Sequence, residues 1–132
     1  MDYSKMSDQE INVAVAEIFH PDSVVIESKS RPPSACITGH LPSLLADYCN
    51  NPADAWPIIV SNLISVEPDY EFIDPSEEQV FASGAWIAEH YDGKGAHLQI
   101  VDINPLRAAM IVFLMMQDSA NVPANSTGSD LR

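Results

Sequence analysis

The run of nine consecutive apolar residues from Ala108 to Met116 constrains the fold of this chain more than any other feature. Asn104 and Pro105 precede it, and they are a favoured N-cap and a favoured first residue of an α-helix. A helix that is apolar on nearly all sides must be covered on nearly all sides. Thirteen helical residues reach only about 20 Å, which is too short to cross a bilayer. We therefore expect a central helix over 104–117 that is buried in the core, or shared between the core and an interface.

The length and charge of the chain limit the classes of protein to which it can belong. It has 132 residues and a formal net charge of −13, with 46% hydrophobic residues. This length suits one domain with one core, and we place that domain at residues 1–117. The small, polar residues 118–132 are expected to form a flexible tail. The negative charge opposes binding to phosphate backbones and favours basic partners, so we expect a protein partner and no direct nucleic-acid binding.

The cysteine content and the N-terminus favour a reduced compartment. Cys36 and Cys49 are the two cysteines, and the first five residues lack the basic and apolar regions of a signal peptide. We expect the cytoplasm, no membrane association, and two reduced, structural thiols. No second pair of ligands completes a zinc site with Cys36 and His40, so no metal or other cofactor is predicted.

Two further helices are predicted from capping and periodicity. Ser7 and Glu10 form a capping box, and apolar residues then recur at helical spacing, which predicts a helix over 8–19. The second helical region begins at Asn51. Because Pro57 would clash with the carbonyl of Ala53, we expect a turn over 52–55 and a helix from Trp56 to Asn62.

The strands are predicted to be antiparallel. Residues 80–91 and 96–101 alternate around Asp92-Gly93, which is a strong hairpin signal, and Gly84 is a candidate bulge. Residues 24–26 predict a short strand. The Pro-rich stretch 28–42 is expected to be a surface loop with at most an edge strand at 35–38, and residues 41–48 one helical turn. This order predicts an α+β fold, built as a three-layer α-β-α sandwich with one small, mainly antiparallel sheet.

The stretch from Glu67 to Glu78 is the strongest local charge feature. It contains six carboxylates and no basic residue, and Tyr70, Phe72 and Ile73 lie among them. A solvated loop is the simplest interpretation. Three large apolar residues suggest instead that the segment is anchored on the body or on a partner. Candidate partner-binding residues in this stretch are Glu71, Asp74, Glu77 and Glu78.

Little in the sequence predicts catalysis. It has no Gly-rich phosphate loop, paired-His metal motif or nucleophile elbow, so no catalytic residue is assigned. His90 and His97 flank the hairpin turn, where a cross-strand polar pair is favoured over a metal or acid–base site. Arg107 at the start of the central helix is either an anion site or, the favoured interpretation, the partner of Asp102 or another carboxylate. Trp56 and Trp86 are expected in the core, or one of them at the rim of a pocket.

Three blocks of sequence resemble a known family. Residues 11–17, 51–59 and 104–109, in this order, are similar to small prophage-encoded proteins of the phage ABA-sandwich type and to the lambdoid NinX proteins. The resemblance covers roughly residues 7–117. It implies an α-β-α sandwich and a phage origin, with no established reaction and no catalytic residues. Residues 28–42 and 67–78 depart from the expected pattern and look like insertions.

Three classes of function follow. The first is a non-catalytic phage accessory protein that binds a host or phage protein. The second is an acidic DNA mimic that blocks a host DNA-binding defence enzyme. The third is a small-ligand or nucleotide-sequestering protein that uses Arg107 and an aromatic residue at an oligomer interface. An enzyme ranks last. The broad apolar surface of the central helix also predicts self-association, as a dimer.

Overall fold

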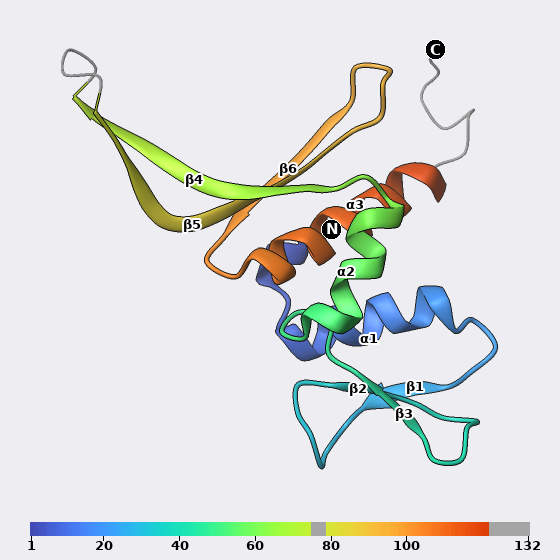
Figure 1. The fold of residues 1–132 in the computed structure, drawn as a ribbon. Coiled ribbons are helices and arrows are strands. Elements are labelled where there is room, and N and C mark those ends of the chain that lie inside the picture. The colour runs from blue at the N-terminus through green and yellow to red at the C-terminus, as the bar shows by residue number, and fades with distance from the viewer. Residues whose placement is uncertain (75–78, 122–132) are drawn as a thin grey trace.

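The fold consists of three helices that lie between two antiparallel sheets (Figure 1). The structure is a computed structural model and describes residues 1–74 and 79–121. Within these residues, the 3-10 helix η1 is Tyr3–Lys5, and the α-helices are α1 (Asp8–Phe19), α2 (Pro52–Ser61) and α3 (Pro105–Asn121). One sheet comprises β1 (Val25–Glu27), β2 (Ala35–Ile37) and β3 (Leu44–Ala46), and the other β4 (Ser65–Asp74), β5 (Gln79–Tyr91) and β6 (His97–Asp102).

Helix α3 is the centre of the core, as its apolar sequence predicts. The oxygen of the Asn104 side chain accepts hydrogen bonds from the backbone N–H groups of Leu106 (2.9 Å) and Arg107 (3.2 Å), which confirms the N-cap. All residues from Ala108 to Leu114 are at most 3% exposed. Helices α1 and α2 and the sheet β4–β6 cover them. The helices and sheet of a single chain therefore cover this helix. Its apolar surface no longer supports the expectation that the protein self-associates.

The sheets are arranged differently from the expected sandwich. The α+β class and the antiparallel pairing are confirmed, but two three-stranded sheets replace the single predicted sheet. The sheet β4–β6 packs on α3, and β1 and β2 pack on α1. The helices are therefore the inner layers and the sheets the outer ones (Figure 1). Two helices and one sheet are enough to cover α3, and the second sheet covers the other side of α1.

The Pro-rich stretch is more ordered than predicted. Strand β2 is the central strand of its sheet, not an edge strand, and its Ala35 and Ile37 are buried. Residues 44–46 form strand β3 instead of the helical turn that was expected within 41–48. The loop prediction for 28–42 was therefore wrong in part, because a three-residue strand is too short to show period-two alternation.

Two helix boundaries also differ from the prediction. Helix α2 begins at Pro52 and passes through Pro57, so the expected separate turn at 52–55 is absent from this described segment. The side chain of Asn51 caps it by accepting from the N–H of Ala53 (3.0 Å), and the helix loses one backbone bond at Pro57. Helix α3 continues to Asn121, beyond the predicted end at 117, and the carboxylate of Asp118 accepts a 2.6 Å hydrogen bond from the Tyr3 hydroxyl. Residues 118–121 of the tail predicted for 118–132 are therefore helical, and residues 122–132 lie outside the described residues.

Candidate protein-binding arm

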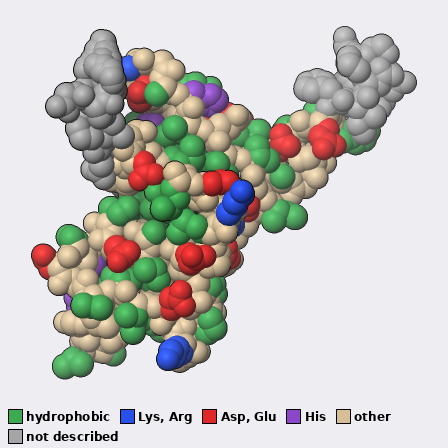
Figure 2. Space-filling model, turned by 180° about the vertical axis from the view of Figure 1, so that it is seen from behind, with side chains coloured by type: hydrophobic (Ala, Val, Ile, Leu, Met, Phe, Trp, Pro, Cys, Tyr) green, Lys and Arg blue, Asp and Glu red, His purple; other side chains and the backbone are tan. Residues whose placement is uncertain are grey.

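Strands β4 and β5 extend beyond the rest of their sheet as a two-stranded arm. Strand β6 pairs with β5 only from Trp86 to Tyr91, whereas β4 pairs with β5 as far as its end at Asp74. We call Asp69–Asp74 and Gln79–Ala85 the β4–β5 arm. It projects from the helices in Figure 1, and in Figure 2 carboxylate and hydrophobic side chains lie along the projection. The acidic stretch is therefore a β-strand up to Asp74 and not the solvated loop of the simplest interpretation.

A bulge at the base of the arm changes its register, as Gly84 predicts. Pro68 pairs with Trp86 but Tyr70 pairs with Ala82, so three residues of β5 lie opposite the single residue Asp69. Gly84 has a φ of +95°, which an L-residue adopts only with strain. The Ser83 hydroxyl donates a 2.8 Å hydrogen bond to the Asp69 carboxylate across the bulge. These contacts hold the arm in a defined geometry.

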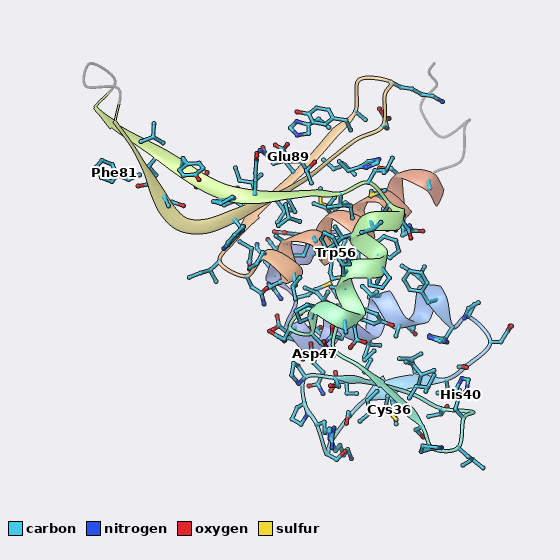
Figure 3. All side chains as sticks on the ribbon, viewed as in Figure 1. Cys36, His40, Asp47, Trp56, Phe81 and Glu89 are labelled. Carbon is cyan, nitrogen blue, oxygen red and sulfur yellow. The ribbon has the colours of Figure 1, made fainter. Side chains whose placement is uncertain are left out.

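The arm exposes apolar side chains that nothing in the described chain covers. Tyr70 is 55% exposed, Phe81 49% and Val80 43%. Figure 3 shows Phe81 near the end of the arm, far from the helices. A two-stranded ribbon has no core of its own, and such a hairpin is only marginally stable in water. Exposed aromatic residues on a projecting ribbon are typical of a surface that another molecule covers.

The carboxylates of the arm and its base lie on one strand at alternate positions. Glu67 and Glu71 are exposed, and Asp69 lies between them. The structure places the backbone of Asp74 at the end of β4, and Glu77 and Glu78 lie outside the described residues. Alternate residues of a strand point to the same face about 6.7 Å apart. The arm therefore combines a row of negative charge with exposed aromatic residues.

The two tryptophans do not occupy the predicted core. Trp56 is 61% exposed on α2, and Trp86 is half-buried where β5 meets β6 and pairs with Asp102. The expectation of core aromatics was therefore wrong for Trp56, because Pro52–Ser61 buries Ala55, Ile58 and Ile59 instead. Trp56 belongs to α2 and not to the arm.

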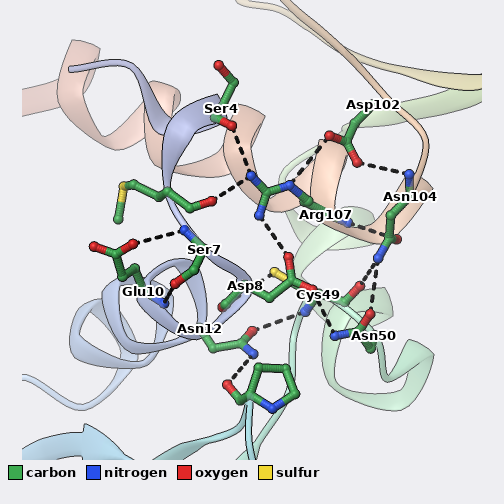
Figure 4. A network of polar contacts seen from close by, with 12 residues as sticks. Ser4, Ser7, Asp8, Glu10, Asn12, Cys49, Asn50, Asp102, Asn104 and Arg107 are labelled. Atoms are coloured by element: carbon green, nitrogen blue, oxygen red, sulfur yellow. Dashed lines mark hydrogen bonds and ion pairs between the residues drawn. The ribbon is translucent and has the colours of Figure 1, made fainter.

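Arg107 forms the ion pairs that the sequence favoured (Figure 4). Its Nη1 lies 2.7 Å from Asp8 Oδ1, and its Nε lies 3.4 Å from Asp102 Oδ1. Its Nη2 donates to the backbone carbonyls of Ser4 (3.1 Å) and Met6 (2.7 Å). The guanidinium therefore joins η1, α1 and the start of α3, and an anionic ligand would have to displace these contacts.

A second group of polar contacts continues this junction, and sequence reasoning missed it. The buried amide of Asn12 donates to the Pro33 carbonyl and to Asp47 Oδ1, both at 2.9 Å, and its oxygen accepts from the N–H of Cys49 (3.1 Å). The Asn104 amide donates to the carbonyl of Cys49 (2.8 Å). Burial raises the pKa of the Cys49 thiol well above its usual value, so this thiol is not an activated nucleophile. These contacts satisfy the hydrogen-bonding groups of Asn12 and of the backbone at Cys49.

The histidines of the hairpin do not face each other. His97 stacks on Tyr91 with ring centroids 4.2 Å apart, and its Nε2 lies 3.4 Å from Glu89 Oε1. His90 pairs in register with Leu98 instead. His90, Leu98 and residues of the last turns of α3 line a cleft of about 330 Å³, which does not include Arg107. Within residues 1–74 and 79–121, no group of three or more His, Cys, Asp or Glu side chains is arranged to hold a metal ion.

Comparison with known families identifies the chain. The family described as "Bacteriophage P22, NinX" matches residues 2–117. The chain belongs to this phage family. The resemblance to NinX proteins is thereby confirmed, and the matched range includes both stretches that looked like insertions. None of the curated proteins matches the chain.

Membership of the NinX family places the chain among phage proteins without assigning a site. None of the helices in the described part of this NinX-family protein is long and apolar enough to cross a membrane. The β4–β5 arm is therefore a candidate protein-binding surface on the grounds of the structure and not of the family match. The signal available in the sequence was the placement of Tyr70 among carboxylates, which favoured an anchored segment over a solvated loop.

Proposed function

We propose that this NinX-family protein is a non-catalytic phage accessory protein that binds a host or phage protein through its β4–β5 arm. The single observation that carries the proposal is the projecting arm, which exposes Phe81 in register with Glu71 on one face and Tyr70 and Val80 on the other. Aromatic residues are enriched at the centres of protein interfaces, and complementary charge accelerates association. The partner is a protein with a basic rim and an apolar site, in the host cytoplasm.

The ten residues of β4 give the arm a second means of binding. Among the strands that the structure describes, β4 is an edge strand, because the sheet order β4-β5-β6 gives it β5 alone as a neighbour. A partner strand can pair with such an edge through backbone hydrogen bonds. Pro68 supplies no N–H and limits this pairing near the base of the arm. Backbone pairing would therefore be concentrated beyond Pro68, beside Tyr70 and Glu71.

The DNA-mimic alternative has less support. A mimic needs ordered carboxylates in an extended array, and the arm offers one strand of them with aromatic residues between. The carboxylate of Asp69 is already hydrogen-bonded to Ser83. In the view of Figure 2, acidic side chains are scattered over the body and separated by hydrophobic and neutral ones. Mimicry remains an outcome of the tests, recognised when duplex DNA competes with this protein for the same partner.

Neutralising the arm tests the proposal. We expect the double variant Glu67→Gln/Glu71→Gln to fold normally and to associate with its partner about tenfold more slowly at low ionic strength, because steering by local charge is lost. The difference should shrink at high salt, where exposed charges are screened. The measurement is the association rate at two ionic strengths, with a partner captured from a lysate of the phage-carrying host.

The matched control changes the same amount of charge elsewhere. Glu17 and Asp22 are exposed residues at and after the end of α1, outside the arm. The variant Glu17→Gln/Asp22→Asn should associate at nearly the wild-type rate. Equal rates for both double variants would mean that only the total charge matters, and the arm would lose its role.

A further inference from the structure

The outer face of the small sheet β1–β3 carries an exposed apolar row. Ile26, Cys36 and Leu45 pair with one another in register across the three strands. Their neighbours Ala35, Ile37 and Ala46 are buried toward the helices, so this row faces away from them. Ile26 is 50% exposed, Leu45 is 40% exposed, and Cys36 is half-buried. The sheet therefore presents an unpartnered apolar face to solvent.

A groove of about 450 Å³ lies on this face. The apolar row lines it together with Glu27, Lys29 and three serines, which are Ser28, Ser30 and Ser43. Lys29 is exposed at this groove, and the exposed Arg31 follows two residues later. The lining is thus apolar at the sheet and polar at its rim, as in the sites where proteins bind other proteins.

The groove is lined mainly from the longest stretch of the chain that lacks acidic residues. Residues 28–46 contain no Asp or Glu, although the whole chain has 19 of them, and they include two of its six basic residues, Lys29 and Arg31. The next basic residue after Arg31 is Lys94. Glu27 is the single carboxylate of the groove lining. The groove lining therefore holds one carboxylate and one ammonium group, and Arg31 adds a second positive charge to this segment of a strongly negative protein.

The β4–β5 arm is complementary to this groove in both charge and polarity. The arm and its base offer the carboxylates of Glu67 and Glu71, and the exposed Phe81 pairs in register with Glu71 on the same face. The two surfaces lie at opposite ends of the molecule, as the positions of Phe81 and Cys36 in Figure 3 show. The arm cannot fold back onto the groove of its own chain. A second copy, turned end to end, brings each arm to the other copy's groove.

We propose that the β4–β5 arm of one copy binds the β1–β3 groove of a second copy, reciprocally, in a twofold-symmetric dimer. Phe81 of the arm covers the row of Ile26, Cys36 and Leu45. The carboxylates of Glu67 and Glu71, which lie on the same face of the arm as Phe81, meet Lys29 and Arg31. Exchanging two identical contacts closes the assembly, whereas a single head-to-tail contact would continue into a filament. The dimer goes beyond the proposed function, and it covers the arm, so it competes with binding of another protein.

A charge-reversal experiment with the purified full chain tests this dimer. The groove variant Lys29→Glu/Arg31→Glu and the arm variant Glu67→Lys/Glu71→Lys should each dimerise at least about tenfold more weakly than wild type, because like charges then face each other. An equimolar mixture should recover the dimer. In that heterodimer the unaltered arm of the groove variant meets the unaltered groove of the arm variant. At the other contact, the reversed arm meets the reversed groove, so opposite charges face each other at both contacts. Sedimentation at micromolar concentrations measures all three samples.

Thiol labelling gives an independent measurement. Cys49 is fully buried, so Cys36 is the cysteine that a maleimide reaches in the folded protein. Labelling of Cys36 should slow as the wild-type concentration rises through the dimerisation range, and it should not slow in the groove variant. A monomeric wild type across the micromolar range, or a mixture that associates no better than its components, would overturn the proposal. The groove variant leaves the arm unchanged. A result that rules out the dimer therefore does not contradict the proposal that the arm binds another protein.

Discussion

The Met110→Asp variant is expected to yield no folded, soluble protein. Met110 is fully buried in α3, within the run from Ala108 to Leu114 that is at most 3% exposed. An unpaired carboxylate buried at this position costs several kcal/mol, which is comparable to the roughly 5–15 kcal/mol that stabilises a whole domain. Circular dichroism and a thermal melt of the purified protein measure the effect. A cooperative melt at the wild-type temperature would show that α3 is not the centre of the fold.

Two control variants separate burial from the substitution itself. Met110→Leu conserves apolar character and nearly conserves volume, and it should cost less than about 1.5 kcal/mol. Ser119→Asp places the same carboxylate on an exposed position of the same helix. It should change the stability by no more than about 0.5 kcal/mol. If Ser119→Asp were as damaging as Met110→Asp, a general intolerance of α3 to charge would explain both results.

The Arg107→Met variant is expected to lower the free energy of unfolding by roughly 2–3 kcal/mol. Breaking a buried ion pair costs about 3–5 kcal/mol, and partial exposure reduces this figure. The Arg107 side chain is 13% exposed, and those of Asp8 and Asp102 are 33% and 22% exposed. The substitution keeps most of the aliphatic part of the side chain but leaves two carboxylates and two backbone carbonyls without their donor. Urea denaturation at neutral pH measures the change.

Lys5 provides the matched control for Arg107. Its ammonium lies 4.0 Å from the Asp2 carboxylate, and the two side chains are 84% and 57% exposed. Lys5→Met removes the same charge and should change the stability by less than about 0.5 kcal/mol. Arg107→Lys should fall between wild type and Arg107→Met, because an ammonium cannot reproduce the planar arrangement of donors. Equal stability of the Lys5 and Arg107 variants would show that the junction does not depend on the guanidinium.

Local sequence signals predicted most of the secondary structure. The capping box at Ser7 and Glu10 is present in both of its hydrogen bonds, and α1 has the predicted bounds. The hairpin turn is also confirmed: the Asp92 carboxylate accepts from the N–H groups of Lys94 (2.7 Å) and Ala96 (3.0 Å). The backbone N–H of Lys94 is the main reason that the pKa of Asp92 is lowered. Such features succeed because the residues that determine them are neighbours in the chain.

Features that depend on contacts between residues far apart in the sequence could not be predicted from local signals. The exposure of Trp56 depends on which side of α2 faces the core, and Pro57 obscured the helix itself. The contacts of Asn12 with Asp47 and Cys49 join segments more than 30 residues apart. Hydrophobic periodicity carries no information about such polar pairing. The blocks that carry the family resemblance contain Asn12 and Arg107, so part of that resemblance lies in this junction.

The arm was only partly foreseen for the same reason. The carboxylates and aromatic residues of 67–78 were visible in the sequence and suggested an anchored segment. Their placement on a projecting ribbon depends on the lengths of β4 and β5 relative to β6. A hairpin signal at Asp92-Gly93 predicted β5 and β6, whereas residues 65–74 were not predicted to form a strand. The groove of β1–β3 was missed because its strands have three residues each.

Site-specific photo-cross-linking tests the central claim, that the arm binds another protein, most directly. A photoreactive phenylalanine analogue replaces Phe81 on the arm, and in a separate control it replaces Leu63, which is 79% exposed just before β4 begins. Both variants are irradiated in phage-carrying host cells, and the adducts are identified by mass spectrometry. We predict a defined adduct between position 81 and a protein other than this chain, without the same adduct at position 63. Identical adducts at both positions, or adducts at position 81 with further copies of this chain alone, would contradict the account.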